Sequence, residues 1–370
     1  MMKREGKYLA RKGIADIKPY IPGKPIQEVR RELGLNDVIK LASNENPLGP
    51  SPLAVKAIKE AVDQIHLYPD AESSELRNAV SDFLGVPPDH LIFGNGGEEI
   101  VTLIGKAFIN EGEPCVIPHP SFDAYETVVR IMGGLICFSR LAEYRINLDD
   151  MAEKIDEKTK IVFICNPLNP TGTIVTRDEL DTFLEGIPSE TVVVLDEAYC
   201  DFVSDAGYPD GIEYVRRGRN VIVLRTFSKV YGLGGIRIGY GVSRPELIHL
   251  LRQVKEPFNV NILAQIGALA ALRDREHLER TVGLIHRERA YLYRELSSMG
   301  VKFVPTEANF ILIDVGLDST LVFQGMLKRG IIVRPGNVWE LPHFIRLTVG
   351  TRDQNQRFIK ALRDILNRGG

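Results

Sequence analysis

The chain lacks the features that mark membrane, exported and nucleic-acid-binding proteins. Its 46 basic and 49 acidic side chains leave a net charge of −3 at pH 7, which gives no sign of nucleic-acid binding. No stretch of about 18 apolar residues is present, so we expect no membrane-spanning helix. The first residues, MMKREGKYLARKGIADIKPY, contain no apolar run of the length that a signal peptide needs. We therefore expect a cytoplasmic protein with neither nucleic-acid nor membrane partners.

Patterns that would indicate metal, disulfide or nucleotide chemistry are also missing. The four cysteines are scattered without a CxxC pair, and most follow or lie within apolar runs, which favours buried, reduced thiols. The seven histidines are dispersed, so no metal site is expected. Neither a GxSxG elbow nor a P-loop lysine motif occurs. The segment GNGGEE fails the dinucleotide-binding pattern, because Glu99 stands where the last glycine belongs.

The apolar runs that are present indicate an α/β protein. KIVFICNP (160–167), TVVVLDEAY (191–199) and NVIVLRTFS (220–228) are continuous rather than alternating, which is typical of strands buried on both faces of a parallel sheet. Helical patterns follow most of them, as in βαβ units. After a long helical pattern from about 260 to 299, the strands become shorter. The sequence predicts an N-terminal segment (1–43), a large sheet domain (44–265) and a smaller α+β domain (266–370).

Polar residues gather just after the predicted strands, where open α/β sheets bind their ligands. These segments are 94–98, 121–125, 166–172, 196–199 and 226–229. Among their residues are a single lysine, Lys229, and an acid at a strand end, Asp196. A buried lysine is costly to keep charged unless it is paired or chemically used. An acid that follows four apolar residues in a buried strand needs a cationic partner.

Pyridoxal 5′-phosphate is the cofactor that needs such a set of residues. It requires a lysine for its Schiff base, an acid facing its pyridine nitrogen, and a phosphate cradle of amides, hydroxyls and an arginine. Asp196 would keep the pyridine nitrogen protonated, so that the ring can accept electrons. Backbone amides at a helix N-terminus would contribute to the cradle. The residues predicted to hold the phosphate are Gly97, Glu98, Thr226, Ser228 and Arg237.

A series of motifs in the chain resembles a known family. These are NENPLGPSP (44–52), YPD (68–70), NPLNPTG (166–172), DEAY (196–199), SKVYGLGGIRIGY (228–240) and FIRLTVGT (344–351). In this order they resemble the fold-type-I pyridoxal-phosphate aminotransferases, over nearly the whole chain. Within that family, PYIPGKP (19–25), the form of LASNENPLGPSP and the compact length are similar to the histidinol-phosphate aminotransferases. The resemblance implies a large, mostly parallel, seven-stranded type of sheet with helices on both faces, plus a smaller α+β domain.

The resemblance assigns roles around the cofactor. Lys229 resembles the Schiff-base lysine, and Asp196 the partner of the pyridine nitrogen. Asn169 and Tyr199 resemble the donors to the phenolic oxygen of the ring. Tyr125 resembles the aromatic residue that stacks on the ring. One departure is that relatives often have Gly-Ser-Asp-Glu at the phosphate turn, where this chain has GGEE (96–99), so that a hydroxyl is lost. Another is a leucine at position 168, where many relatives carry asparagine.

Further roles concern the substrates and a second subunit. Tyr68 resembles the tyrosine that reaches the phosphate of the neighbouring subunit's cofactor, which implies a homodimer with shared active sites. Arg346 resembles the arginine that binds the α-carboxylate of glutamate. Arg334 and Tyr20 lie where this subgroup recognises the substrate phosphate, and Asn44 lies in the segment that lines the same pocket.

The function implied by the resemblance is transamination between L-histidinol phosphate and 2-oxoglutarate. The products would be imidazole acetol phosphate and L-glutamate, as in histidine biosynthesis. Three alternatives stay open. The chain could be an aromatic amino-acid aminotransferase, a phosphothreonine decarboxylase on the same scaffold, or a non-enzymatic regulator that binds pyridoxal phosphate.

Overall fold

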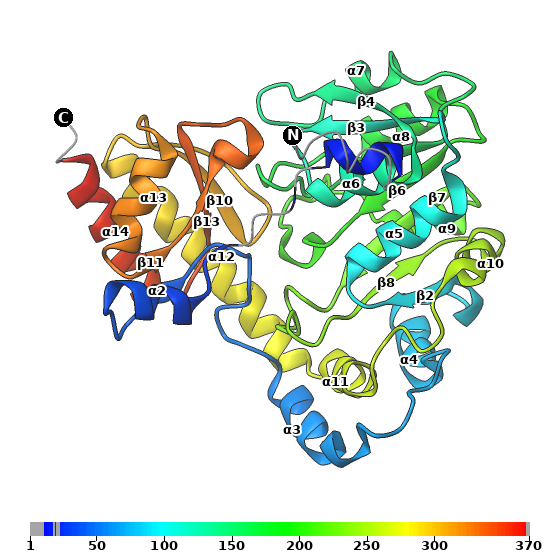
Figure 1. The fold of residues 1–370 in the computed structure, drawn as a ribbon, viewed down its shortest axis with the longest axis horizontal. Helices are drawn as coiled ribbons and strands as arrows, with labels where there is room; N and C mark the ends of the chain where they lie inside the picture. Colours follow the sequence, from blue (N-terminus) through cyan, green and yellow to red (C-terminus); the bar gives the residue numbers. More distant parts are fainter. Residues whose placement is uncertain (1–10, 18, 20–22, 368–370) are drawn as a thin grey trace, which may run out of the picture.

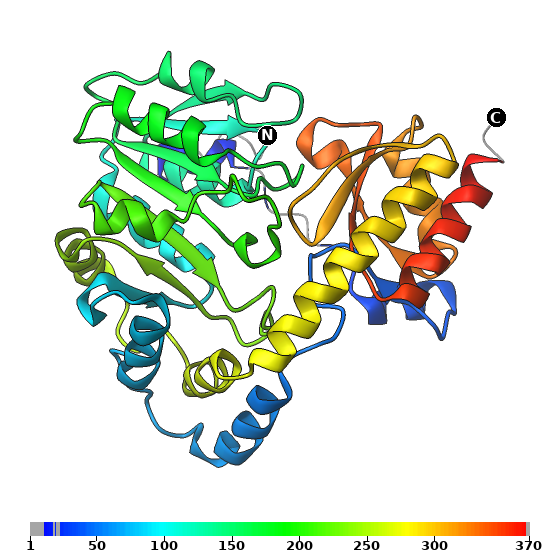
Figure 2. The same ribbon diagram turned by 180° about the vertical axis from the view of Figure 1, so that it is seen from behind.

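A computed structural model describes residues 11–17, 19 and 23–367. Two sheet-based domains lie side by side, and the long helix α12 (Arg275–Ser298) runs from one to the other (Figures 1 and 2). Tyr20, predicted to bind the substrate phosphate, lies outside the described residues. No helix in the described part of the chain is long and apolar enough to cross a membrane.

The large domain is built on a seven-stranded sheet, and it confirms the predicted α/β class. Every neighbouring pair is parallel except those that involve β8, which runs antiparallel to both β2 and β7. Every residue of β5 and β6 is buried, which explains their continuous apolar sequences. In spatial order the strands are β2 (Leu91–Gly94), β8 (Gly239–Val242), β7 (Val221–Thr226), β6 (Val192–Asp196), β5 (Ile161–Cys165), β3 (Pro114–His119) and β4 (Leu135–Arg140).

Helices cover both faces of this sheet. The strand order moves one way through β2, β3 and β4 and then back through β5, β6 and β7. Because parallel crossovers are right-handed, the connecting helices change face at that reversal. The helices of this domain are α5 (Gly97–Phe108), α6 (Asp123–Met132), α7 (Leu148–Ala152), α8 (Arg177–Gly186), α9 (Gly211–Arg216) and α10 (Pro245–Val254), with the short η4 (Pro88–His90) and η5 (Cys200–Phe202).

A group of helices lies below the sheet in Figure 1. Helix α11 (Ile262–Leu272) packs on α3 (Pro52–Ala61) and on α4 (Ser74–Leu84), and η3 (Val62–Gln64) continues α3. The domain boundary predicted at residues 265/266 falls inside α11. Because α11 packs on helices of the large domain, we propose a boundary near the start of α12 instead.

The small domain contains an antiparallel sheet, in the order β12 (Arg334–Pro335), β13 (Phe344–Thr348), β10 (Phe310–Asp314), β9 (Lys302–Val304). Helices α12, α13 (Ser319–Leu327) and α14 (Arg352–Leu366) pack with it, and η6 (Gly336–Trp339) connects β12 to β13. From the N-terminal segment, β1 (Ile39–Lys40) pairs with β11 (Ile331–Ile332), and α2 (Ile26–Leu33) precedes β1. The remaining element, η2 (Lys12–Asp16), packs on α6 of the large domain.

Candidate active site

A cavity opens where the carboxyl ends of the central strands of the large domain face the small-domain sheet. Strands β5, β6 and β7 end there, and β12 and β13 contribute side chains from the other side. Most of the residues predicted from the sequence line this one cavity. They are Asn44, Gly97, Glu98, Asn169, Asp196, Tyr199, Thr226, Ser228, Lys229, Arg237, Arg334 and Arg346.

Lys229 lies in the loop after β7, with Nζ 5.4 Å from the centre of the Tyr199 ring. Burial and the positive charges of Arg346 and Arg237 together lower the pKa of its amine to about 8, against the opposing effect of nearby carboxylates. A lysine with this pKa has a substantial neutral fraction near neutral pH, whereas an exposed lysine has almost none. Lys229 is therefore a nucleophilic amine suited to bonding with a carbonyl group.

Asp196 is the last residue of the buried strand β6 and is 8% exposed. Its Oδ1 accepts a hydrogen bond from the backbone N–H of Ala198 at 3.0 Å, and its Oδ2 accepts one from the hydroxyl of Tyr125 at 2.5 Å. Burial raises the pKa of Asp196, and the Tyr125 hydroxyl opposes this shift. A carboxylate that is held in place at the wall of a cavity suits a cationic ring nitrogen.

The role predicted for Tyr125, stacking on the cofactor ring, does not fit its position. Tyr125 is fully buried, stacks on Phe163 with ring centres 4.7 Å apart, and does not line the cavity. In this segment the aromatic residue that lines the cavity is Phe122, which meets Tyr125 edge-on at 5.5 Å. Helix α6 begins at Asp123, so Phe122 lies in the loop at the strand end, while Tyr125 faces the core. Tyr125 thus lies in the core, on the side of Asp196 that faces away from the cavity, and donates a hydrogen bond to it.

The phosphate turn has an uncapped helix N-terminus. Helix α5 begins at Gly97, and its N-cap residue, Gly96, has φ +85° and provides no side-chain cap. The guanidinium of Arg237 lies against Gly96, since a Cβ there would be 2.4 Å from Nη2. Nearby, Oγ1 of Thr226 on β7 accepts from the N–H of Ser228 at 3.0 Å. Thr226 pairs with Gly239, which lies against the N–H of Gly97. Helix amides, a guanidinium and two hydroxyls at one place fit an anion such as phosphate.

Asn44 joins three parts of the chain at the cavity wall. It has a left-handed backbone (φ +56°), which is uncommon for a residue other than glycine. Its Nδ2 donates to the hydroxyl oxygen of Tyr199 at 3.0 Å, and its N–H donates to Oγ1 of Thr348 at 2.9 Å. Asn309 in turn donates to its carbonyl oxygen at 3.0 Å. These bonds join the segment at Asn44 to the loop after β6 and to the small domain.

Two arginines from the small domain face the same cavity. Arg334 on β12 and Arg346 on β13 are directly opposite in the antiparallel pair, and each is only 6% exposed. Arg346 donates to Oδ1 of Asn169 at 2.5 Å and to the carbonyl oxygen of Ala42 at 2.8 Å. The first bond leaves the amide NH₂ of Asn169 as its donor end. Two adjacent buried cations indicate a site for an anionic substrate.

Trp339 is a cavity residue that the sequence analysis missed. It is the only tryptophan of the chain, it lies at the end of η6, and it is 6% exposed. The Cζ atom of Arg346 lies 4.9 Å from the Trp339 ring centre and 5.2 Å from that of Phe310, within the range of cation–π contacts. The sequence feature that could have identified Trp339 is its position between Arg334 and Arg346. Other lining residues that were not singled out are Ser43, Asp123, Cys165, Ala198, Leu224 and Arg225.

Tyr68 does not reach this cavity. Its side chain is 83% exposed, and its ring stacks on Phe258 with centres 4.8 Å apart. The loop that carries Tyr68 follows η3, in the group of helices below the sheet in Figure 1. Within one subunit, Tyr68 therefore contributes nothing to the cavity.

The described fold and site define the fold-type-I aminotransferase class. The class is recognised by its large, mostly parallel sheet and by a buried aspartate and a half-buried lysine at or just after the ends of neighbouring strands. The family model described as "Aminotransferase class I and II" matches residues 36–362, so the chain belongs to this aminotransferase family.

Individual relatives agree with this membership. The chain is 52% identical to the histidinol-phosphate aminotransferase of Moorella thermoacetica, over 96% of this chain and 92% of the relative. It is 47% identical to the histidinol-phosphate aminotransferase of Caldicellulosiruptor saccharolyticus, over 96% of this chain and 99% of the relative. A solved structure of the enzyme of that name from Sinorhizobium meliloti, in complex with pyridoxal-5′-phosphate, has a TM-score of 0.87 at 26% identity and covers 96% of this chain and 98% of that one. The resemblance to histidinol-phosphate aminotransferases is thereby confirmed.

Proposed function

We propose that the protein uses pyridoxal 5′-phosphate to transfer the amino group of L-histidinol phosphate to 2-oxoglutarate. The products are imidazole acetol phosphate and L-glutamate, a step of histidine biosynthesis and hence of amino-acid biosynthesis. The observation that carries the proposal is the pair of buried arginines, Arg334 and Arg346, in the same cavity as Lys229 and Asp196. The names of the relatives at 52% and 47% identity support it.

The cavity offers a partner for each polar group of pyridoxal phosphate. The amine of Lys229 matches the aldehyde, and Asp196 matches the pyridine nitrogen. The hydroxyl of Tyr199 and the amide of Asn169 are donors for the phenolic oxygen. The uncapped start of α5, together with Arg237, matches the phosphate. In place of Tyr125, we propose that Phe122 provides the aromatic contact with the ring.

The mechanism follows from what these side chains hold and move. When bound, pyridoxal phosphate supplies an electron sink for the charge that forms at the substrate Cα. Asp196 holds a proton at the ring nitrogen, which strengthens that sink. Lys229 would hold the aldehyde of the bound cofactor, and its free Nζ would be the base that takes up and returns the proton of the substrate Cα. The lowered pKa of Lys229 suits this exchange of protons near neutral pH.

Both substrates are anions, and the arginines recognise that shared property. Histidinol phosphate carries a phosphate where glutamate carries a carboxylate, so one pair of arginines can serve both in turn. Arg346 is fixed by Asn169 and Ala42 and binds the anionic group that both substrates place at this end. Arg334 acts mainly on the phosphate. The role of Tyr20 at the phosphate stays a prediction from the sequence.

A second copy of the chain completes the site in this proposal. Apolar side chains are exposed along α3, η3 and the loop that follows, beside Phe258. Exposed large apolar side chains that recur along one stretch of chain indicate a protein interface. Covering it would bring Tyr68 to the phosphate in the cavity of the partner. The exposed residues are Leu53 (47%), Val62 (47%), Ile65 (64%), Leu67 (54%), Tyr68 (83%) and Phe258 (43%).

Sedimentation of the cofactor-loaded protein at low concentration tests the dimer. We expect activity to follow the dimer fraction, and an active monomer would contradict the shared site. The cytoplasmic location stays a prediction from the sequence.

An assay with parallel amino donors tests the substrate. The purified protein, pyridoxal phosphate and 2-oxoglutarate are incubated with histidinol phosphate, phenylalanine, tyrosine or phosphothreonine, and glutamate and CO₂ are measured. We expect glutamate mainly from histidinol phosphate. Equal rates with phenylalanine would indicate an aromatic aminotransferase, and CO₂ from phosphothreonine would indicate the decarboxylase. Cofactor binding without turnover of any donor would indicate a regulator.

A further inference from the structure

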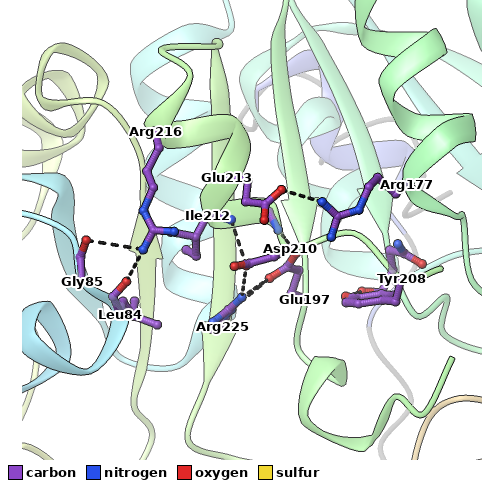
Figure 3. A network of polar contacts seen from close by, with 12 residues as sticks. Leu84, Gly85, Arg177, Glu197, Tyr208, Asp210, Ile212, Glu213, Arg216 and Arg225 are labelled. Carbon is purple, nitrogen blue, oxygen red and sulfur yellow. Dashed lines mark hydrogen bonds and ion pairs between the residues drawn. The ribbon is translucent and has the colours of Figure 1, made fainter. Parts of the chain in front are cut away.

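A buried ion pair lies directly beside two of the residues that face the cavity. Glu197 follows Asp196 in the chain, and Arg225 precedes Thr226. Nε and Nη2 of Arg225 both donate to Oε2 of Glu197, at 2.9 and 2.7 Å (Figure 3). The Glu197 side chain has no exposed surface, and that of Arg225 is 18% exposed. The two-pronged contact therefore fixes the guanidinium plane as well as its position.

The ion pair joins the ends of two neighbouring strands. Asp196 on β6 is in register with Leu224 on β7, and the N–H of Glu197 donates to the carbonyl oxygen of Leu224 at 2.8 Å. Glu197 and Arg225 thus continue the pairing of β6 and β7 with a side-chain bond at the end of the ladder. Asp196 and Thr226 lie at those two strand ends, each next in the chain to a member of the pair.

A third segment, at the start of α9, contacts both members of the ion pair. Oε1 of Glu197 accepts from the N–H of Gly211 at 2.8 Å, and Oδ1 of Asp210 accepts from Nη2 of Arg225 at 3.0 Å. A Cβ at Gly211 would lie 2.5 Å from Oε1 of Glu197, so a larger residue there would displace the Glu197 carboxylate. Figure 3 shows the pair held between the two strands and the start of α9.

A buried ion pair contributes little net stability, because the cost of desolvating both charges offsets their attraction. A pair of apolar side chains of the same size could replace the ion pair without loss of stability, but it would not fix the two strand ends in one orientation. We propose that Glu197 and Arg225 are positioning residues whose ion pair sets the separation of Asp196 and Thr226, and so matches it to the length of the bound cofactor. This inference rests on the proposed function, since Asp196 and Thr226 are there the partners of the ring nitrogen and the phosphate.

The variant Glu197→Gln tests the inference. Glutamine has one acceptor oxygen, so it can accept from either Gly211 or Arg225. Its NH₂ group then faces the N–H of the residue that is left without an acceptor. We expect the dissociation constant of pyridoxal phosphate, measured by fluorescence titration of the apoprotein, to rise about ten- to a hundredfold, as when other residues that orient a ligand group are lost. The phosphorus-31 resonance of the bound cofactor should shift too, because Thr226 has moved.

The control is Glu213→Gln, in the same region of Figure 3. Glu213 accepts from Arg177 at 2.7 Å, but both side chains are more than a third exposed, and neither lines the cavity. We expect its cofactor dissociation constant to stay within about twofold of the unaltered protein, since an exposed ion pair has little energetic effect. Thermal midpoints of all apoproteins are measured beside the titrations.

A lower thermal midpoint for Glu197→Gln with an unchanged cofactor dissociation constant would overturn the positioning role. If that variant does not fold, Arg225→Lys takes its place, because lysine keeps the charge and loses the two-pronged contact. If Arg225→Lys binds pyridoxal phosphate with the same dissociation constant as the unaltered protein, the inference is also overturned. Failure of the unaltered protein to bind pyridoxal phosphate would instead contradict the proposed function.

Discussion

The two walls of the cavity are built in different ways. The wall from the large domain consists of residues at or after the ends of buried parallel strands, among them Asp196, Thr226 and Lys229. The wall from the small domain consists of Arg334 and Arg346 on antiparallel strands. The buried centre of the large sheet therefore carries the residues that match the cofactor. The small sheet carries the cations that match the anionic substrates.

The two walls come from different domains, so their functions should separate under mutation. One bond between them runs from Arg346 to Asn169. Variants of the large-domain wall should affect cofactor chemistry, and variants of the small-domain wall should affect substrate binding. The predictions below test that division, from the largest expected effect to the smallest.

Replacing Lys229 with alanine should abolish covalent capture of the cofactor. Turnover should fall by at least the factor of about 10²–10⁴ that a positioned acid–base group supplies. Borohydride reduction followed by denaturation and mass spectrometry measures the covalent label. Lys255 is a matched control, because burial lowers the pKa of its amine too, while its Nζ donates to the carbonyl oxygen of Ala71 away from the cavity. Label retained in Lys229→Ala, or lost in Lys255→Ala, would contradict the assignment.

Replacing Asp196 with asparagine should leave a folded protein that turns over about 10²–10³ times more slowly, because a preorganised charge at the reacting group is lost. The Michaelis constant for histidinol phosphate should change little, since the arginines are intact. Steady-state kinetics measure both quantities. Near-normal turnover would remove Asp196 from the site.

Replacing Arg346 with alanine should weaken both half-reactions. Loss of a charge-assisted contact typically costs about 1.5–3 kcal/mol, or roughly ten- to a hundredfold in binding. The absorbance change of the cofactor, followed separately with histidinol phosphate and with glutamate, measures each half-reaction. Damage confined to one substrate would show that the arginines are not shared.

The same variant should also change the pH dependence of Lys229. The positive charge of Arg346 helps to hold the pKa of the lysine near about 8, so its removal raises that pKa toward the ordinary value of 10.5. The neutral, reactive amine then appears only at higher pH. The rate at which the apoprotein captures the cofactor aldehyde, measured between pH 6 and 10, should shift its midpoint upward. A midpoint that stays in place would mean that the charges of the two walls are not coupled.

Trp339 should give the smallest effect. Replacement by phenylalanine keeps an aromatic ring beside Arg346 but weakens a cation–π contact worth about 0.5–2 kcal/mol, so a few-fold rise in the Michaelis constants is expected. Because Trp339 is the only tryptophan, fluorescence excited selectively at the tryptophan reports this position alone. Fluorescence should change when inorganic phosphate or histidinol phosphate binds, and an unchanged signal at saturation would place the anion elsewhere.

The large-domain wall could be predicted from the sequence better than the small-domain wall. Continuous apolar runs located β5, β6 and β7, and the residues that follow them, Asp196 and Lys229, were found at their ends. Tyr125 was misplaced because Phe122 and Tyr125 are only three residues apart, and the choice between them depends on where α6 begins. Periodicity alone does not fix that start.

The small-domain wall depends on short elements and long-range contacts. Arg334 lies on a strand of two residues, and Trp339 ends a short 3₁₀ turn, so neither has a periodic pattern that reveals the direction of its side chain. Asn44 reaches Thr348, 304 positions away, through a left-handed backbone that no local signal in the sequence predicts. The family resemblance identified these arginines, whereas residue patterns alone did not.

The division between the two walls is tested most directly with Arg334→Ala. The dissociation constant of pyridoxal phosphate and the Michaelis constant for histidinol phosphate are measured on the same preparation. The account predicts a cofactor constant within about twofold of the unaltered protein and a Michaelis constant that is roughly ten- to a hundredfold higher. The division between the two walls would be contradicted if the dissociation constant of pyridoxal phosphate rose by the same factor, or if the Michaelis constant for histidinol phosphate did not change.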